Sequence, residues 1–135
     1  MTRIIALDWG EKRIGVAFSE GILASPHSVI KRKGKVKDYE QIVKLTIETE
    51  AELLVIGLPA SLNPEQPIGP QAKRVLKHYQ ALEKMLDIPV KLSNESYSTV
   101  DATHFLQQSG RKTKVPIDAA AAAVILQAFL DGRNK

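Results

Sequence analysis

The N-terminal stretch of the chain constrains the fold more than any other part of it. An apolar run from Ile4 to Leu7 ends in a carboxylate, Asp8, and residues 13–19 form a second apolar run after a short turn that contains glycine. Because the side chains of a strand alternate between its two faces, Asp8 shares a face with Ile4 and Ala6. The pattern predicts two neighbouring strands, and a carboxylate at the end of the first that either caps a loop or takes part in chemistry.

Hydrophobic periodicity predicts five strands and four helices. Short continuous apolar runs are typical of buried strands, and apolar positions that recur every three or four residues are typical of helices. We expect strands at residues 3–9, 13–19, 22–30, 53–57 and 89–93. We expect helices at residues 38–51, 70–86, 98–108 and 116–132. Pro26 favours an edge position or a bend for the third strand, and Asp38 with Gln41 resembles a capping pair at the start of the first helix.

This order of elements predicts an α/β fold in a single domain that spans residues 1–135. The first three strands follow one another closely and should form an antiparallel meander, whereas the next two are each reached through a helix and should run parallel to the first. The result is a mixed five-stranded sheet flanked by helices. The Pro- and Gly-rich stretch 58–70 is long for a connection in a compact domain, so it is either a functional loop or a plain crossover.

The composition excludes several kinds of site. The chain has no cysteine, which excludes disulfides, thiolate metal sites and cysteine nucleophiles. The three histidines lie far apart in the sequence, without the spacing of a metal motif. No apolar run approaches the ~18 residues of a membrane span, and the N-terminus does not resemble a signal peptide, so we expect a cytoplasmic protein without membrane contact. The net charge of +4 permits nucleic-acid binding.

Residues 31–37 hold five basic side chains and no aromatic one. Such a segment is either a solvated loop or a contact to a phosphate backbone. Without aromatic side chains it is not suited to stacking on bases.

Three acids stand at positions that suggest chemistry: Asp8 after the first strand, Glu95 after the fifth, and Asp118 near the start of the last helix. The ends of the parallel strands should open on one edge of the sheet, where α/β proteins usually carry their sites. Asp118 shares a helix face with apolar Ala122, Ile125 and Phe129, which turns its carboxylate inward; alternatively, it only complements the helix dipole. Asp101 is left out, because together with Ser98 it fits a capping box at the start of the predicted helix 98–108.

Three carboxylates brought together repel one another unless a cation lies between them. Hard oxygen ligands without cysteine or suitably spaced histidine select Mg²⁺ or Mn²⁺. Two such ions can activate a water and stabilise the leaving oxygen of a phosphodiester. The predicted reaction is therefore phosphodiester hydrolysis, with the substrate's phosphates held by nearby basic side chains, namely Lys12, Arg13, Lys112 and Lys114.

Four segments resemble the YqgF (RuvX) family: residues 6–17 (ALDWGEKRIGVA), 55–59 (VIGLP), 94–99 (NESYST) and 118–126 (DAAAAAVIL). They run across essentially the whole chain in the family's order. The resemblance implies a ribonuclease H-like fold, a bacterial cytoplasmic protein, and a metal-binding acid triad of the Holliday-junction-resolvase type. Carried over, this catalytic triad falls on Asp8, Glu95 and Asp118. Family members are described as nucleases that process the 5′ end of precursor 16S ribosomal RNA and as junction resolvases.

The second acid carries a departure from the family pattern. The family usually has Asp-Glu-Arg at this point, whereas this chain has Asn94, Glu95 and Ser96. We therefore keep a second hypothesis, a nucleic-acid-binding module with little catalysis. A third, phosphoryl transfer from ATP, would need two such domains around the nucleotide, and the chain has room for one. The expected assembly is a monomer or a homodimer, and resolvase action would favour a symmetric dimer with two sites.

Overall fold

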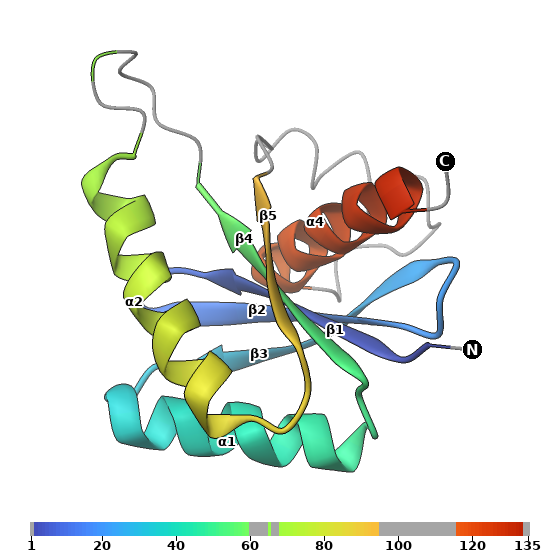
Figure 1. Cartoon of the computed structure of the whole chain (residues 1–135), viewed down its shortest axis with the longest axis horizontal. Coiled ribbons are helices and arrows are strands. Elements are labelled where there is room, and N and C mark those ends of the chain that lie inside the picture. The colour runs from blue at the N-terminus through green and yellow to red at the C-terminus, as the bar shows by residue number, and fades with distance from the viewer. Residues whose placement is uncertain (1, 60–64, 66–67, 95–115, 134–135) are drawn as a thin grey trace.

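Five strands form one mixed sheet, in the order β3-β2-β1-β4-β5 (Figure 1). The computed structural model describes residues 2–59, 65, 68–94 and 116–133. The elements in chain order are β1 (Ile4–Trp9), β2 (Arg13–Ser19), β3 (Ala24–Lys31), α1 (Lys35–Glu48), β4 (Leu53–Leu58), α2 (Pro70–Met85), β5 (Val90–Asn94) and α4 (Ile117–Arg133). The predicted helix at 98–108 lies outside the described residues.

The strand directions confirm the predicted mixed sheet. β1 pairs antiparallel with β2, and β2 pairs antiparallel with β3. β1 pairs parallel with β4, and β4 pairs parallel with β5. The C-terminal ends of β1, β4 and β5 therefore lie at one edge of the sheet, where a parallel α/β sheet usually carries its site.

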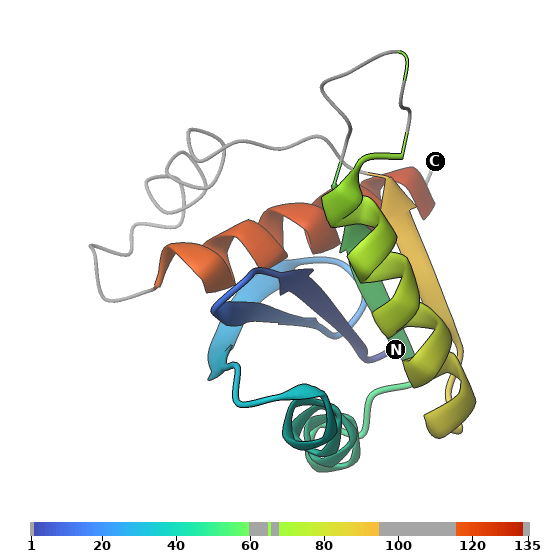
Figure 2. The ribbon, with the colours of Figure 1, turned by 90° about the vertical axis from the view of Figure 1, so that its left-hand side faces the viewer.

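The helices cover both faces of the sheet, with α4 on the side opposite to α1 (Figures 1 and 2). Ile4 and Ala6 of β1 pack with Ala122 and Leu126 of α4 in one core cluster. Ile5 and Leu7 alternate with them and pack in a second cluster, which includes residues of α1 and α2. The period-2 alternation of β1 therefore divides the core into two layers, as the sequence predicts.

Helix α4 approaches the sheet closely because small residues meet at the contact. Its residues Ala119–Ala123 are all buried, and Ala122 and Ala123 pack in one cluster with Ile4 and Ala6 of β1. The sheet has glycine at two points of contact with this helix. A Cβ atom added to Gly15 of β2 would overlap the backbone carbonyl of Asp118, and one added to Gly57 of β4 would lie 2.5 Å from Ile125 Cδ1. The start of α4 thus rests on the bare backbone of β2.

The start of α1 differs from the prediction. The helix begins at Lys35 rather than at residue 38, with Gly34 as N-cap and no side-chain capping bond. The predicted capping pair of Asp38 and Gln41 is wrong, because the Asp38 carboxylate is buried and accepts hydrogen bonds from Arg32 Nε and the Lys33 backbone N–H. The basic segment 31–37 is accordingly not a plain loop: it joins the end of β3 to the first turn of α1.

Strand β3 begins later than predicted, at Ala24 rather than at residue 22. Ile22 and Leu23 lie before it, and are 65% and 74% exposed. Pro26 is correctly predicted to lie on an edge strand, and a register irregularity occurs opposite it, between Val16 and Ala17. No helix in the described part of the chain is both long and apolar enough to cross a membrane.

Candidate active site

Asp8 lies at the C-terminal end of β1, on the face of the sheet that α4 covers. Its position follows from alternation, since Ile4 and Ala6 of the same strand pack against α4. Asp8 is paired in register with Gly15 of β2 and is partly exposed. A carboxylate at this point adjoins solvent while its strand is anchored in the core.

Asp118 reaches the same place from the first turn of α4. Its backbone carbonyl lies directly over Gly15, the residue that pairs with Asp8. The structure thus brings together two of the three predicted acids, which are 110 positions apart in the chain. Ala122 and Ile125 are buried on the same side of α4, as predicted from their spacing, and the Asp118 side chain remains 30% exposed at the edge.

Arg13 forms an ion pair with Asp118. Its Nε lies 3.0 Å from Asp118 Oδ2, and the Arg13 side chain is 53% exposed. The pair partly neutralises the carboxylate charge and fixes its orientation. Lys12 lies in the turn before β2 and Arg13 at its start, and both side chains are exposed at this edge.

Three predicted site residues, Glu95, Lys112 and Lys114, lie outside the described residues. The described part of β5 ends at Asn94, which pairs with Leu58 at the same edge of the sheet. Within the residues described, no group of three acidic or histidine side chains forms a metal site. Two carboxylates at a solvent-facing edge nevertheless fit Mg²⁺ or Mn²⁺ chemically, because both ions prefer oxygen ligands and retain several waters.

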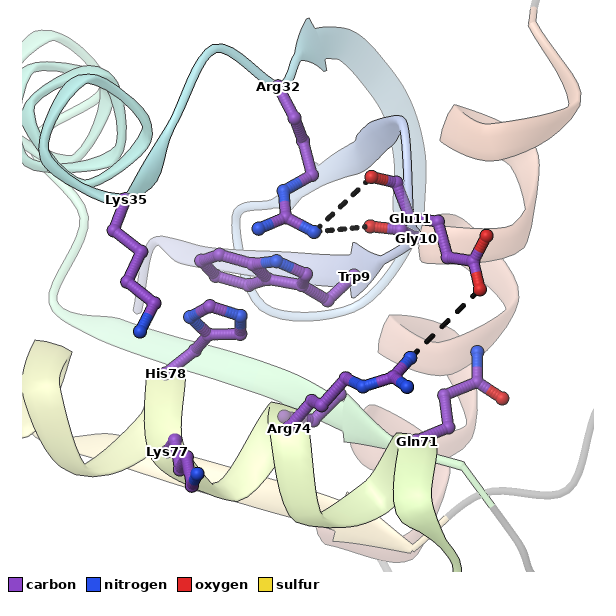
Figure 3. A pocket seen from close by; sticks show the side chains of 10 residues that line it. Trp9, Gly10, Glu11, Arg32, Lys35, Gln71, Arg74, Lys77 and His78 are labelled. Atoms are coloured by element: carbon purple, nitrogen blue, oxygen red, sulfur yellow. Dashed lines mark hydrogen bonds and ion pairs between the residues drawn. The ribbon is translucent and has the colours of Figure 1, made fainter.

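A pocket of about 240 Å³ lies on the other face of the same edge (Figure 3). Trp9, which follows Asp8 and therefore points the other way, lies in its wall between Arg32 and His78. The indole stacks on the His78 ring with centroids 4.1 Å apart, and the Arg32 guanidinium carbon lies 5.8 Å from its centroid on the side away from His78. Sequence reasoning missed this pocket, which is built from β1, α2 and the segment between β3 and α1.

Arg32 holds the turn between β1 and β2. Its Nη1 donates to the carbonyl oxygens of Gly10 and Glu11 at 3.2 and 3.3 Å, and its Nε lies 3.3 Å from Asp38 Oδ2. The Asp38 side chain is only 1% exposed, while that of Arg32 is 24% exposed. Arg32, one member of the basic segment, thus has a structural role.

Replacing Asp38 with asparagine should lower the free energy of unfolding by about 2–3 kcal/mol, because it leaves the Arg32 cation half-buried without its carboxylate. Urea unfolding would measure the change. Glu48→Gln is the matched control, since Glu48 pairs with Lys44 on the exposed side of the same helix, and should change stability by less than about 0.5 kcal/mol. Equal effects of the two substitutions would contradict the role assigned to Asp38.

His78 is a neutral partner of Trp9. Burial, followed by the positive charges of Arg32 and Lys35, lowers the pKa of His78 from 6.5 to about 4, against an opposing effect of Asp38. The Tyr39 hydroxyl lies 2.7 Å from His78 Nδ1, and a neutral imidazole can accept its hydrogen bond. A signal for His78 was available in the sequence: it lies three residues after Val75 and four before Leu82, on the buried side of α2.

The pKa of His78 predicts a loss of stability in mild acid. The unfolded chain takes up this proton near pH 6.5 but the folded chain only near pH 4, so the stabilisation is complete above pH 6.5 and is lost as the pH falls towards 4. The His78 contribution should be about 2–3 kcal/mol. Unfolding free energies measured between pH 7 and pH 4.5 should fall less steeply for His78→Phe than for the natural chain. Parallel pH profiles would contradict the assignment.

Comparison with known proteins gives concordant results. The family model "RuvX: Holliday junction resolvase" matches residues 2–132. A protein of Syntrophomonas wolfei named "Putative pre-16S rRNA nuclease" is 42% identical over 135 residues, which cover 96% of this chain and 94% of the relative. A Dehalococcoides mccartyi protein with the same name is 44% identical over 128 residues, which cover 93% and 95% of the two chains.

The solved structures agree on the fold. T. thermophilus RuvC in complex with a Holliday junction substrate superposes with a TM-score of 0.66 at 12% sequence identity, over 99% of this chain and 96% of that one. This likeness confirms the ribonuclease H-like fold. Because the family match spans nearly the whole chain, and two relatives of almost equal length are more than 40% identical to it, the chain belongs to the RuvX family.

Proposed function

We propose that this protein is a metal-dependent endonuclease that hydrolyses phosphodiester bonds in the cytoplasm. One observation supports the proposal: Asp8 and Asp118 both adjoin Gly15. Asp8 pairs with Gly15 across the sheet, and the backbone carbonyl of Asp118 lies against it, at the edge where β1, β4 and β5 end. The names of the relatives support a nuclease that acts on precursor 16S ribosomal RNA, which is the favoured substrate. The resemblance to the YqgF (RuvX) family favours the 5′ end of that RNA as the place of cleavage.

The proposed roles follow from the side chains. Asp8, Asp118 and Glu95 would hold Mg²⁺ or Mn²⁺, which when bound supplies a more acidic water and a positive charge beside the reacting phosphate. Arg13 positions the Asp118 carboxylate through its ion pair. Lys12, Arg13, Lys112 and Lys114 would bind the phosphates that flank the cut and draw the strand towards this edge.

A four-way DNA junction is the second candidate substrate. The family description and the junction-bound RuvC structure favour it. The two substrates differ in what they require of the assembly. Symmetric cutting of a junction needs two sites related by a two-fold axis, so it would require a homodimer, whereas trimming an RNA end needs one site and is compatible with a monomer.

A cleavage assay separates these possibilities. An end-labelled precursor of 16S ribosomal RNA and a four-way DNA junction are offered in parallel, with Mg²⁺ or Mn²⁺ and with EDTA, to the natural chain and to Asp8→Asn. Cutting of RNA alone, with metal and not by the variant, would support the proposal. Paired symmetric cuts in the junction would favour the resolvase. If neither substrate is cut, the proposal fails and a binding module with Asn94 and Ser96 in place of the usual residues becomes the better explanation.

Metal binding should also be visible without any substrate. An ion that binds only the folded chain stabilises it by about 2.7 kcal/mol at a concentration of 100 times Kd. We therefore expect Mn²⁺ to raise the melting temperature of the natural chain, and to raise that of Asp118→Asn clearly less. Calorimetric titration with Mn²⁺ would give the affinities. An equal shift in both proteins would remove Asp118 from the metal site.

A further inference from the structure

We propose that the pocket beside Trp9 is a second phosphate-binding site, which takes a backbone phosphate of the nucleic-acid strand that passes the edge carrying Asp8 and Asp118. This inference rests on the proposed function for the identity of the strand. The pocket itself lies on the face of the sheet opposite to the two acids (Figure 3). It would hold the substrate away from the point of cleavage.

The charge of the pocket favours an anion. Four cationic side chains line it, from Arg32, Lys35, Arg74 and Lys77, against the single carboxylate of Glu11. The charge of Arg32 is already compensated by Asp38. The ion pair between Glu11 and Arg74 is weak, because its atoms are 4.0 Å apart and both side chains are largely exposed. Among the described residues, neither Lys35 nor Lys77 has an ion-pair partner.

The wall of the pocket also contains a neutral donor that has no acceptor among the described residues. Trp9 is only 5% exposed, and its indole N–H is buried without a hydrogen-bond acceptor among the residues described. An unsatisfied buried donor costs about 1–3 kcal/mol, so nearly all such groups in folded proteins have a partner. A phosphate oxygen would be a suitable acceptor, and a small movement of the indole would be needed to bring the buried N–H to it.

The ring geometry excludes a base as the occupant. One face of the Trp9 indole is covered by His78, with an angle of 11° between the ring planes, and the Arg32 guanidinium lies over the other face. Neither face of the Trp9 indole is therefore left for a base to stack on. The pocket should therefore bind phosphate without regard to sequence, and at about 240 Å³ it is far too small to admit a duplex.

The position of the pocket suits a strand that crosses the sheet edge. Trp9 follows Asp8 directly, and the turn at Gly10 and Glu11 connects the pocket wall to β2, which begins at Arg13. On the far side, the first turns of α2 supply Gln71 and Arg74, shortly after the connection from the end of β4. A strand held by Arg13 at the acid site would need to pass only this turn to reach the pocket.

Trp9 is the only tryptophan of the chain, so its fluorescence reports directly on the pocket. The full chain is titrated in EDTA, which prevents cleavage, with a single-stranded RNA of about twelve nucleotides, with adenosine monophosphate and with inorganic phosphate. Arg74→Gln combined with Lys77→Gln removes two pocket cations. Lys73→Gln combined with Lys84→Gln removes the same charge from exposed positions on the same helix that do not line the pocket.

The RNA should change Trp9 emission in the natural chain. The pocket variant should bind the RNA at least about tenfold more weakly. The slope of its log affinity against log salt concentration should fall by an amount that corresponds to about one to two phosphate contacts. The control variant should lose clearly less. Glu11→Gln should bind the RNA more tightly, a gain that misfolding cannot produce. Equal losses in the two double variants, unchanged emission, or monophosphate binding as tight as RNA binding would each overturn the inference.

The two proposals fail separately. If the chain binds RNA through the pocket but cuts nothing in Mg²⁺ or Mn²⁺, the nuclease proposal is refuted and the phosphate-site proposal stands. If the natural chain cuts RNA and the pocket variant binds RNA as well as the control variant does, the nuclease proposal stands and the phosphate-site proposal is refuted.

Discussion

Asp8→Asn should abolish cleavage while leaving the fold intact. The substitution keeps the size of the side chain but removes the negative charge at the end of β1, and with it one of the proposed metal ligands. We expect the cleavage rate to fall at least about 1000-fold, because stabilisation of charge in the transition state is the largest contribution that such a site makes. Single-turnover cleavage of the labelled RNA measures this loss directly.

The fold of this variant should be preserved because Asp8 lies at the rim of the core, partly exposed. Because the substitution keeps the size of a partly exposed side chain, it should shift the melting temperature by no more than about 4 °C in either direction. Glu20→Gln, which replaces an exposed acid outside the site, is the control and should cut at the natural rate. Activity retained by Asp8→Asn would show that the carboxylate of β1 does not take part in the reaction.

Gly15→Ala should damage both stability and activity. The added Cβ would overlap the backbone carbonyl oxygen and carbon of Asp118. Such a contact with the backbone cannot be relieved by rotating a side chain. Helix α4 must therefore move away from β2. We expect a loss of about 3 kcal/mol in the free energy of unfolding, and at least a 100-fold loss of cleavage, because a displacement of about 1 Å at a catalytic group has an effect of that size.

Gly132→Ala provides the matched control, since Gly132 lies near the end of the same helix and nothing would lie within 4 Å of the added atom. Alanine is the better helix former, so this variant should be as stable as the natural chain or more stable by up to about 1 kcal/mol. Urea unfolding and the cleavage assay apply to both variants. If Gly15→Ala behaved like Gly132→Ala, the start of α4 would not be seated on β2 in the way described.

The layers of the fold and the placement of two acids could be predicted from local rules. Alternation along β1 fixes the face of Asp8, and the helical connections make β4 and β5 parallel to β1. Spacing along α4 put Asp118 on the same side as Ala122. Each of these inferences needs only the period of a strand or helix, and the sequence displays that period directly. The catalytic roles, and the positions of Glu95, Lys112 and Lys114, stay predictions.

Pairings between distant residues could not be predicted in the same way. Arg13 and Asp118 are 105 positions apart, and many other basic side chains could have reached the acid. Arg32 was one of five cations in a short segment, and only the packing of that segment against β1 distinguishes it from the others. Asp38 shows that two local roles can compete. Instead of forming a capping pair with Gln41, its carboxylate accepts hydrogen bonds from Arg32 and Lys33, six and five positions earlier in the chain.

The small size of Ala122 and Ala123 sets an upper limit on side-chain volume where α4 packs against β1. A larger side chain at this contact would push the helix away from the sheet. The distance between Asp118 and β1 therefore depends on the small size of the alanine and glycine residues between them. Core positions elsewhere in the chain can exchange one bulky group for another and repack. Here there is no smaller residue to exchange except glycine, which weakens the helix. Conservative substitutions such as Ala122→Val should therefore change the spacing of Asp8 and Asp118. In this part of the molecule, the geometry of the proposed site and the packing of α4 cannot vary independently.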